Sequence, residues 1–265
     1  MSGVECQSKM TKAICLIPAR MGSSRFPGKP LAPLLGYPLI LHILERCRLC
    51  TSFNHIAVAT CDEEIRDCVV AAKGMAILTS PDHERATDRV EEAISHLNVD
   101  LNDDDFVLMV QGDEILVSPE MVAKMLSSYE ESPSPVVNLV TPLYSEADIE
   151  DVNTVKVVGT EDGRAIYFSR SPIPSRVRDK DAKVYQQTGI IGFSYSFLRQ
   201  FALLPPTRLE ATESVDMLRV IEHGYHIQLI YSDVETIGVD TPGDLKRAEE
   251  RLKIDPITRR YMTLQ

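Results

Sequence analysis

The feature that most constrains the fold is the regular alternation of strand-like and helix-like segments in the first half of the chain. Short apolar runs predict strands at 13–18, 55–60, 75–79 and 106–111. Amphipathic segments predict helices at 38–50, 63–73, 87–97 and 119–129. This alternation favours right-handed crossovers and a mostly parallel sheet with helices on both faces. We therefore expect an α/β fold with its ligands at the carboxyl ends of the strands.

The second half of the chain has a different order of predicted strands and helices. Strands are predicted at 136–143, 155–159, 165–168 and 190–195, with Asp162-Gly163 as a hairpin turn. A helix at 213–223, a strand at 226–231 and a helix at 242–252 return to the alternating pattern. The pattern predicts one domain over 13–252, with a mixed-sheet lobe inserted at about 136–200 and a flexible tail over 1–12.

Composition narrows the class of protein. The 265 residues are 44% hydrophobic and carry a net charge of −11, which argues against a nucleic-acid-binding or membrane-binding surface. No apolar run approaches the roughly 20 residues of a membrane span, and the N-terminus lacks a signal-peptide pattern. The six cysteines include only one close pair, Cys47 and Cys50, and are predicted to be reduced structural thiols. These features predict a cytoplasmic protein.

The loop after the first predicted strand is rich in glycine, serine and cations. Gly22, Ser23 and Gly28 allow backbone N–H groups to approach a phosphate, and Arg20, Arg25 and Lys29 supply positive charge. The spacing matches neither the Walker motif nor the dinucleotide fingerprint. The loop therefore predicts a phosphate site, with an exposed basic turn as the alternative.

Two later motifs place carboxylates at strand ends. Gln111-Gly112-Asp113-Glu114 follows an apolar strand, and Asp113 is placed to hold Mg²⁺ on phosphate oxygens. Asp240 ends another strand and could pair with Asp113 on the same ion. The alternatives are a solvated turn at Asp113 and a helix cap at Asp240 or Thr241.

These motifs together resemble the CMP-KDO synthetases (3-deoxy-manno-octulosonate cytidylyltransferases), a branch of the sugar nucleotidyltransferases. The resemblance runs from Ile14 to about Leu252, in the family's order and at its spacing. The matching stretches are IPARMGSSRFPGKPL (17–31), VATCD (58–62), TDR (87–89), VQGDE (110–114), VKVV (155–158), YFSRSPIP (167–174) and GVDTP (238–242). It implies a Rossmann-like nucleotidyltransferase domain whose inserted lobe mediates dimerisation.

The resemblance also implies an activity and roles for individual residues. The enzyme would attach CMP from CTP to an acidic sugar, release pyrophosphate and serve lipopolysaccharide biosynthesis as a homodimer. Arg20, Arg25, Lys29, Asp113 and Asp240 would be catalytic, with Asp113 and Asp240 also holding Mg²⁺. The implied nucleotide-binding positions are Pro18, Ala19, Arg20, Gly22, Ser23, Lys29, Thr60, Thr87, Arg89 and Gln111. The implied sugar-binding positions are Lys156, Tyr167, Arg170, Gln187 and Glu210.

The sequence departs from the family pattern at several positions. Arg85 and Ala86 replace serine and glycine before the third helix, Gln187 replaces a histidine of the sugar pocket, and Met217 replaces a glutamine. Losing a hydrogen bond to a buried substrate group costs about 1–3 kcal/mol. The resemblance implies that the acceptor is KDO or a closely related 2-keto-3-deoxy sugar acid. The changed sugar contacts leave a modified sugar, such as 8-amino-KDO or another ulosonic acid, as the alternative. A non-catalytic CTP-binding protein is a further alternative.

Overall fold

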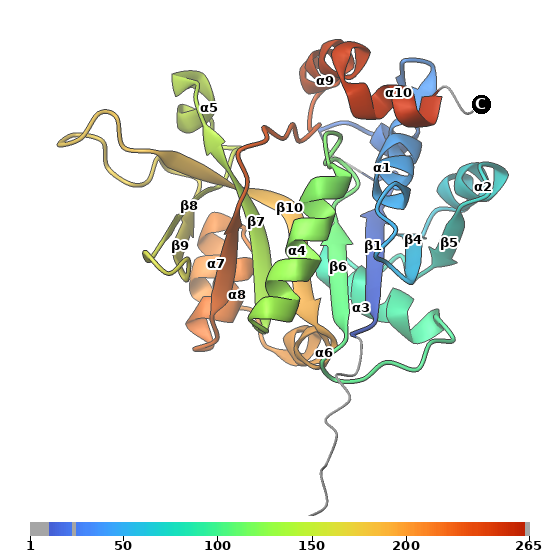
Figure 1. The fold of residues 1–265 in the computed structure, drawn as a ribbon, viewed down its shortest axis with the longest axis horizontal. Coiled ribbons are helices and arrows are strands. Elements are labelled where there is room, and N and C mark those ends of the chain that lie inside the picture. The colour runs from blue at the N-terminus through green and yellow to red at the C-terminus, as the bar shows by residue number, and fades with distance from the viewer. Residues whose placement is uncertain (1–10, 23–24, 263–265) are drawn as a thin grey trace, which may run out of the picture.

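A computed structural model describes residues 11–22 and 25–262 and, within them, a nine-stranded sheet. Its main path runs β11-β7-β10-β6-β1-β4-β5, with β8 and β9 branching from β10 (Figure 1). The strands of this sheet are β1 (Ala13–Ala19), β4 (His55–Thr60), β5 (Met75–Leu78), β6 (Phe106–Val110), β7 (Val136–Leu143), β8 (Lys156–Gly159), β9 (Ala165–Ser169), β10 (Val184–Ser194) and β11 (Ile227–Tyr231). The short strands β2 (Pro33–Leu34) and β3 (Tyr37–Pro38) pair separately.

Four of the six strand pairings along the main path are parallel, as the alternation predicts. β1 pairs in parallel with β4 and β6, and β7 pairs in parallel with β11. β10 runs antiparallel to both of its neighbours, β6 and β7. The α/β fold with a mostly parallel sheet is therefore confirmed, and the carboxyl ends of β1, β4, β5 and β6 lie along one edge.

Helices cover both faces of the sheet (Figure 1). They are α1 (Leu39–Arg48), α2 (Glu63–Ala71), α3 (Ala86–His96), α4 (Pro119–Glu131), α5 (Glu146–Glu150), α6 (Tyr195–Leu203), α7 (Arg208–Glu213), α8 (Met217–Glu222), α9 (Pro242–Ile254), α10 (Pro256–Met262) and the 3-10 helix η1 (Lys29–Leu31). Sequence reasoning did not predict α5, α6 or α10.

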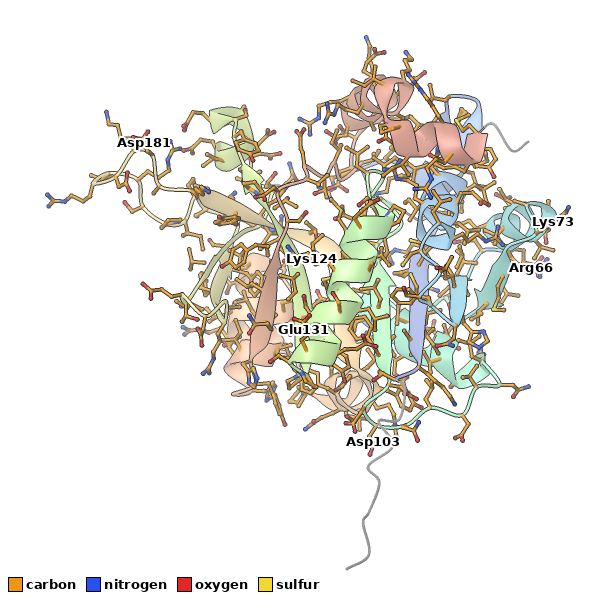
Figure 2. The ribbon with its side chains drawn as sticks, viewed as in Figure 1. Arg66, Lys73, Asp103, Lys124, Glu131 and Asp181 are labelled. Carbon is orange, nitrogen blue, oxygen red and sulfur yellow. The ribbon has the colours of Figure 1, made fainter. Side chains whose placement is uncertain are left out.

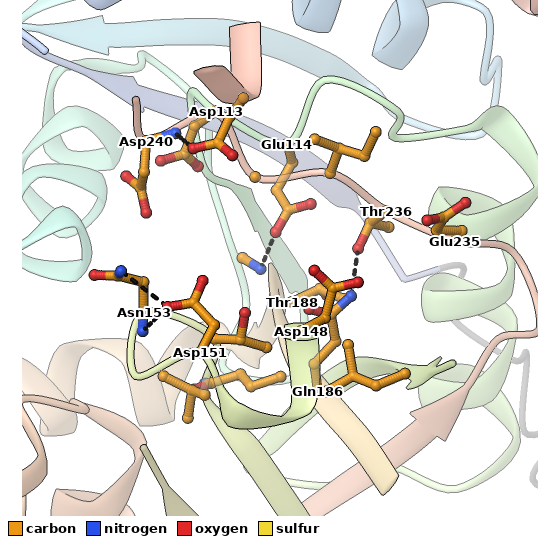
Figure 3. Close-up of a pocket in the computed structure, with 18 of the residues that line it drawn as sticks. Asp113, Glu114, Asp148, Asp151, Asn153, Gln186, Thr188, Glu235, Thr236 and Asp240 are labelled. Atoms are coloured by element: carbon orange, nitrogen blue, oxygen red, sulfur yellow. Dashed lines mark hydrogen bonds between the residues drawn. The ribbon is translucent and has the colours of Figure 1, made fainter. Parts of the chain in front are cut away.

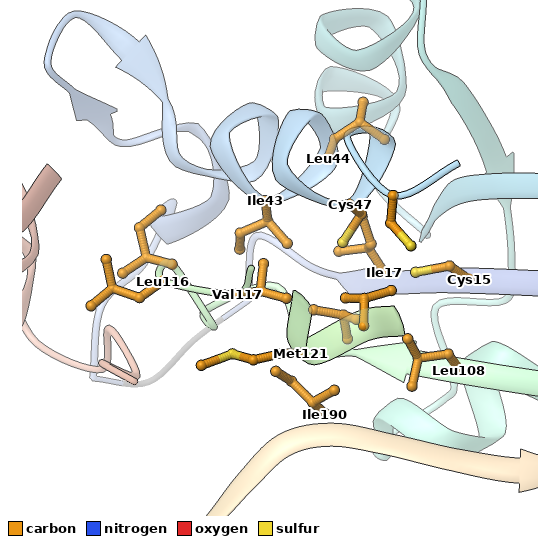
Figure 4. Packing of buried hydrophobic residues seen from close by; sticks show 14 of the residues in the cluster. Cys15, Ile17, Ile43, Leu44, Cys47, Leu108, Leu116, Val117, Met121 and Ile190 are labelled. Carbon is orange, nitrogen blue, oxygen red and sulfur yellow. The ribbon is translucent and has the colours of Figure 1, made fainter. Parts of the chain in front are cut away.

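The core divides into two layers because buried strands send alternate side chains to opposite faces. In β1, Cys15 and Ile17 join the cluster under α1 and α4, whereas Ile14 and Leu16 join the cluster under α3 and α6. Figure 4 shows the first layer, in which Cys47 of α1 packs beside Cys15. These cysteines are free and buried, which fits the predicted structural role.

The expected lobe at 136–200 needs correction. β7 and the C-terminal half of β10 are full members of the central sheet. The register of β10 on β7 shifts between Gln187 and Ile191. The N-terminal half of β10 still pairs with β7, but its other neighbour is β8, whereas the C-terminal half has β6 there. The projecting part is therefore residues 144–187, which we call the projecting segment; its outer loop carries Asp181 (Figure 2).

Two further expectations fail near the C-terminus. The predicted helix at 213–223 is two short helices, α7 and α8, because Ser214 adopts a left-handed conformation with φ of 53° that ends the first. The domain also extends past residue 252, since α10 packs on α1 and Tyr261 is 3% exposed.

At the other end of the chain, residues 1–10 of the predicted tail lie outside the described residues. The backbone N–H of Lys12 donates to Asp105 Oδ1. Within the described residues, no helix is long and apolar enough to cross a membrane.

Candidate active site

Two adjoining cavities open at the carboxyl edge of the sheet. The narrow cavity, of about 320 Å³, lies at the ends of β1 and β6. The wide cavity, of about 540 Å³, extends from there to the projecting segment and the chain after β11. Both cavities are lined by Arg25, Gln111, Asp113 and Asp240, so these residues form the wall where the two meet.

The narrow cavity is shaped by the predicted phosphate loop. Its lining includes the predicted residues Pro18, Ala19, Arg20, Gly22, Arg25, Lys29, Arg89, Gln111, Asp113 and Asp240. Gly28 bends the loop with φ of 75°, and its N–H donates to the carbonyl of Met21 at 3.1 Å. The Met21 N–H in turn donates to Asp62 Oδ2 at 2.8 Å. The predicted Ser23 lies outside the described residues.

Gly112 allows the two strand ends to approach each other. A Cβ atom at this position would lie 2.8 Å from the carbonyl oxygen of Pro18, closer than real Cβ contacts come. A larger residue would push the turn after β6 away from the phosphate loop. The glycine therefore fixes the spacing between the loop and Asp113.

Lys29 joins the two predicted metal ligands. Its Nζ donates to Asp113 Oδ2 at 2.8 Å and lies 3.4 Å from Asp240 Oδ1. It also donates to the carbonyl of Val239 at 2.7 Å. Two carboxylates from separate strand ends thus converge on one positive charge.

Asp240 is available for this role because its neighbour caps the helix. Thr241 Oγ1 accepts from the N–H of Asp244, and the Asp244 carboxylate accepts from the N–H of Thr241. This capping box accounts for the start of α9 without the Asp240 side chain. The alternative reading of Asp240 as the helix cap is therefore wrong.

The carboxylate oxygens of Asp113 and Asp240 are donors of the kind that Mg²⁺ prefers. Across residues 11–22 and 25–262, no group of three or more His, Cys, Asp or Glu side chains is arranged to hold a metal ion. Mg²⁺ commonly takes one or two carboxylates and completes its shell with substrate phosphates and water. Asp113 and Asp240 supply that pair of hard oxygen donors beside the phosphate loop.

Arg25 spans both cavities. One guanidinium nitrogen lies 3.1 Å from Asp240 Oδ1, and the other donates to Asn153 Oδ1 at 2.8 Å. Asn153 belongs to the projecting segment, so Arg25 links that segment to the phosphate loop. The sequence did not indicate Asn153.

Some predicted nucleotide residues are structural in this arrangement. Thr60 is buried, and its Oγ1 accepts from the N–H of Asp62. Thr87 is 1% exposed, and its Oγ1 lies 3.4 Å from Asp216 Oδ2. Neither lines the narrow cavity. Arg89 does line it, and its guanidinium holds the β5–α3 loop through Thr79 Oγ1 and two backbone carbonyls.

The predicted sugar residues separate into two groups. Arg170 and Gln187 line the wide cavity, and Gln187 Nε2 donates to Asn138 Oδ1 at 3.0 Å. Lys156 is fully buried, and its Nζ donates to the carbonyls of Asp151, Thr154 and Arg170. Burial lowers the pKa of Lys156 despite nearby acids. Its donors are therefore directed at the backbone and away from the cavity.

Tyr167 and Glu210 also lie outside the lining of the wide cavity. The Tyr167 hydroxyl donates to Glu213 Oε1 at 3.1 Å. Glu210 is buried and pairs with Arg219 at 2.6 Å and with Arg85 at 2.7 Å. Burial opposes ionisation of Glu210, but the hydrogen bonds from Arg219 prevail and lower its pKa.

The departures from the family pattern have structural explanations. The positive charge of Arg85 is balanced by Glu210 and by Asp216, whose Oδ1 lies 2.6 Å away. Met217 is 1% exposed and belongs to the core layer under α3 and α6. Met217 therefore does not line the wide cavity. Of the two positions where a predicted sugar contact is changed, only Gln187 lines it.

Glu114 is the residue that sequence reasoning missed. It lies beside Asp113 at one end of the wide cavity (Figure 3) and is 6% exposed. Its Oε1 accepts from the N–H of Gly189, and its Oε2 is without a partner among the described residues. Burial, with a contribution from Asp113, raises its pKa to about 7. The sequence showed an acid at this position but not that it is buried.

Comparison with known proteins agrees with this geometry. A family model described as Cytidylyltransferase matches residues 14–232. The 8-amino-3,8-dideoxy-manno-octulosonate cytidylyltransferase of Shewanella sp. (strain ANA-3) is 42% identical over 242 residues, covering 91% of this chain and 98% of the relative. The enzyme of the same name from Shewanella sediminis (strain HAW-EB3) is 41% identical over the same shares.

Solved structures give the same grouping. A CMP:2-keto-3-deoxy-manno-octonic acid synthetase solved with CTP superposes with a TM-score of 0.84 at 35% identity, covering 92% of this chain and 99% of that chain. A 4-diphosphocytidyl-2C-methyl-D-erythritol synthase shares the fold, with a TM-score of 0.64 at 15% identity over 92% of this chain and 100% of that chain. The chain therefore belongs to the cytidylyltransferase family.

Proposed function

We propose that the protein transfers CMP from CTP to an octulosonate-type 2-keto-3-deoxy sugar acid, with the 8-amino form as the favoured acceptor. The observation that carries the proposal is the shared wall of the two cavities. Arg25, Asp113 and Asp240 line both, so a triphosphate in the narrow cavity and a sugar in the wide one would meet there. The names of the relatives support the same acceptor class.

The reaction follows from that arrangement. The anomeric hydroxyl oxygen of the sugar forms a bond to the α-phosphorus of CTP and releases its proton to solvent. The bond between the α-phosphorus and the bridging oxygen breaks, and pyrophosphate leaves with that electron pair. Arg20 and Arg25 hold the phosphates, and Lys29 neutralises charge at the α-phosphate. When bound by Asp113 and Asp240, Mg²⁺ supplies further charge neutralisation on the phosphates. The chain thus acts mainly by positioning and electrostatics.

The charge of the wide cavity favours an acceptor that carries an ammonium group. Its arginines are Arg25, Arg170 and Arg247, and its acids outnumber them. The acids are Asp113, Glu114, Asp148, Asp151, Glu235, Asp240 and Asp244. Asp113 and Asp240 are assigned to the metal, and Asp148, Asp244 and Glu235 lie within ion-pair distance of arginines. Glu114 and Asp151 are the acids of the lining that remain. These carboxylates attract an ammonium group, while Arg170 offers positive charge to the carboxylate of the sugar acid.

The proposal also covers the oligomeric state and the cellular location of the protein. Several large apolar side chains of the projecting segment are exposed, among them Tyr144 at 75% and Val177 at 83%. Exposed apolar side chains grouped on one segment favour burial against another molecule. We infer a cytoplasmic homodimer formed through this segment, with a product used in lipopolysaccharide biosynthesis.

The test is pyrophosphate release from CTP and Mg²⁺ with KDO, 8-amino-KDO and sialic-acid-type ulosonates as acceptors. We expect release with the octulosonates, fastest with 8-amino-KDO, and none with Mg²⁺ omitted. Faster turnover of KDO would contradict the amino-sugar preference. No turnover of any acceptor, with CTP still bound, would favour the non-catalytic CTP-binding alternative.

A further inference from the structure

Glu114 is held in place by the fold on one side only. Its Oε1 is fixed by the N–H of Gly189, in the irregular part of β10. Its backbone is fixed as well, because its N–H donates to Gln111 at 3.1 Å and its carbonyl accepts from Val117 at 3.1 Å. The side chain therefore has a defined direction, and the wide cavity is the space it lines.

The other carboxylate oxygen, Oε2, is unsatisfied. Of the buried carboxylates in the described part of the chain, only Glu114 has an oxygen that accepts no hydrogen bond. A buried polar atom without a partner destabilises a protein, and such atoms are rare in folded structures. Among the residues that the structure describes, the fold supplies a donor to Oε1 alone, so Oε2 is left for a bound group.

The position of Glu114 narrows the choice of that group. Glu114 lines the wide cavity but not the narrow one, which disfavours the nucleotide. Lys29 Nζ hydrogen bonds to Asp113 and lies within ion-pair distance of Asp240. Within residues 11–22 and 25–262, Glu114 makes no ion pair with Lys29, although the charges of Asp113, Asp240 and Lys29 all act on it. Glu114 is therefore not held by the lysine that joins the two carboxylates assigned to the metal. The remaining candidate for the group bound by Glu114 is the acceptor sugar.

We propose that Glu114 is a sugar-binding residue whose Oε2 accepts a hydrogen bond from a hydroxyl or ammonium group of the acceptor. Because Glu114 follows Asp113 directly, this contact lies close to the wall where the two cavities meet. It would orient the sugar so that its anomeric hydroxyl faces the α-phosphate. This assignment rests on the proposed function of the wide cavity.

The experiment compares wild type, Glu114→Gln and Glu161→Gln in the pyrophosphate assay. Glu161→Gln makes the same chemical change in the exposed turn between β8 and β9. For Glu114→Gln we expect kcat/KM for the sugar to fall about 10- to 100-fold, with the KM for CTP and the Mg²⁺ requirement unchanged. Glu161→Gln should match wild type.

Comparing two sugar substrates distinguishes the two groups that could donate the hydrogen bond to Glu114. Contact with the ammonium group predicts a larger loss with 8-amino-KDO than with KDO, whereas contact with a hydroxyl predicts equal losses. Deoxy analogues of the sugar, tested on wild type and variant, identify the hydroxyl, because its removal should affect wild type only. Wild-type measurements with these analogues do not depend on the folding of a variant.

Three results would overturn the assignment. One is an unchanged kcat/KM for the sugar in Glu114→Gln, and another is a raised Mg²⁺ requirement with the sugar KM unchanged. A third is equal losses for wild type and variant at every deoxy position, together with equal losses for KDO and 8-amino-KDO. Absence of sugar turnover by wild type itself would instead refute the proposed function.

Discussion

At the residue scale, the arrangement of charges around Lys29 defines the site. The Lys29 ammonium group lies 2.8 Å from Asp113 Oδ2 and 3.4 Å from Asp240 Oδ1 and offsets the negative charge of both carboxylates. Without it, two carboxylates would face each other near the phosphates. The loop and the carboxylates were each predicted from sequence, but their meeting through one lysine depends on the fold.

Replacing Lys29 by methionine tests this arrangement. We expect Lys29→Met to lower kcat about 100-fold or more, because an oriented charge at the developing phosphate charge contributes roughly 3 kcal/mol. Lys246→Met, on the exposed side of α9, is the control and should retain full activity. Steady-state kinetics at saturating CTP measures both. A loss below fivefold in Lys29→Met would mean that Lys29 only holds the carboxylates.

Glu114 predicts a pH dependence of stability in the metal-free protein. Its folded pKa of about 7 lies above the ordinary value of 4.5, so the folded state keeps a proton that the unfolded state has lost between these values. Stability from this group is present below pH 4.5 and is lost as pH rises to 7. The shift corresponds to about 3 kcal/mol. Urea unfolding in chelator, from pH 4.5 to 7.5, should show this loss in wild type relative to Glu114→Gln. Parallel curves for the two proteins would refute it.

At the element scale, the parallel strands and the β8–β9 hairpin were predictable, and the path of β10 was not. Apolar runs such as Ala13–Ala19 indicate buried strands directly, because both of their faces need apolar side chains. β10 instead changes partners along its length at an irregular register, which a local pattern does not encode. The predicted nucleotide and sugar residues also differ in how far the sequence could place them. Residues at strand ends line the narrow cavity, whereas Lys156 and Glu210 form buried contacts that spacing alone could not reveal.

The end of α7 supports the wall of the wide cavity through Glu213. Its carboxylate accepts from the Tyr167 hydroxyl, from Ser169 Oγ and from the N–H of Arg170, while the Arg170 Nε donates to the Glu213 carbonyl at 2.6 Å. Although burial opposes it, these hydrogen bonds lower the pKa of Glu213. The helix end thus fixes the arginine that lines the wide cavity.

Glu213→Ala should therefore affect sugar binding selectively. Loss of these contacts lets Arg170 move, and we expect the KM for the sugar to rise about tenfold, which corresponds to about 1.4 kcal/mol. The KM for CTP should stay within a factor of two. Thr212→Ala, which removes an exposed hydroxyl on the same helix, is the control. Equal rises in both KM values would indicate general unfolding of α7 instead.

At the scale of the whole molecule, the projecting segment lines the wide cavity and also carries exposed apolar side chains. The sequence indicated an inserted lobe but overestimated it, because β7 and half of β10 alternate like an insertion yet pair within the central sheet. What remains outside the body is the stretch that carries exposed Tyr144, Val152 and Val177. The homodimer stays a prediction, and the structure identifies the surface on which to test it.

Val177→Glu is the variant that tests the dimer. Val177 is 83% exposed, so the substitution should not affect the fold of the protomer, but a buried glutamate at an interface would be left without a partner. Sedimentation velocity should find wild type at twice the protomer mass and Val177→Glu shifted toward the monomer. Leu203→Glu makes a comparable change at an 85% exposed residue of α6, outside the projecting segment, and should leave the mass unchanged. A monomeric wild type would refute the dimer, and a dimeric Val177→Glu would place the interface elsewhere.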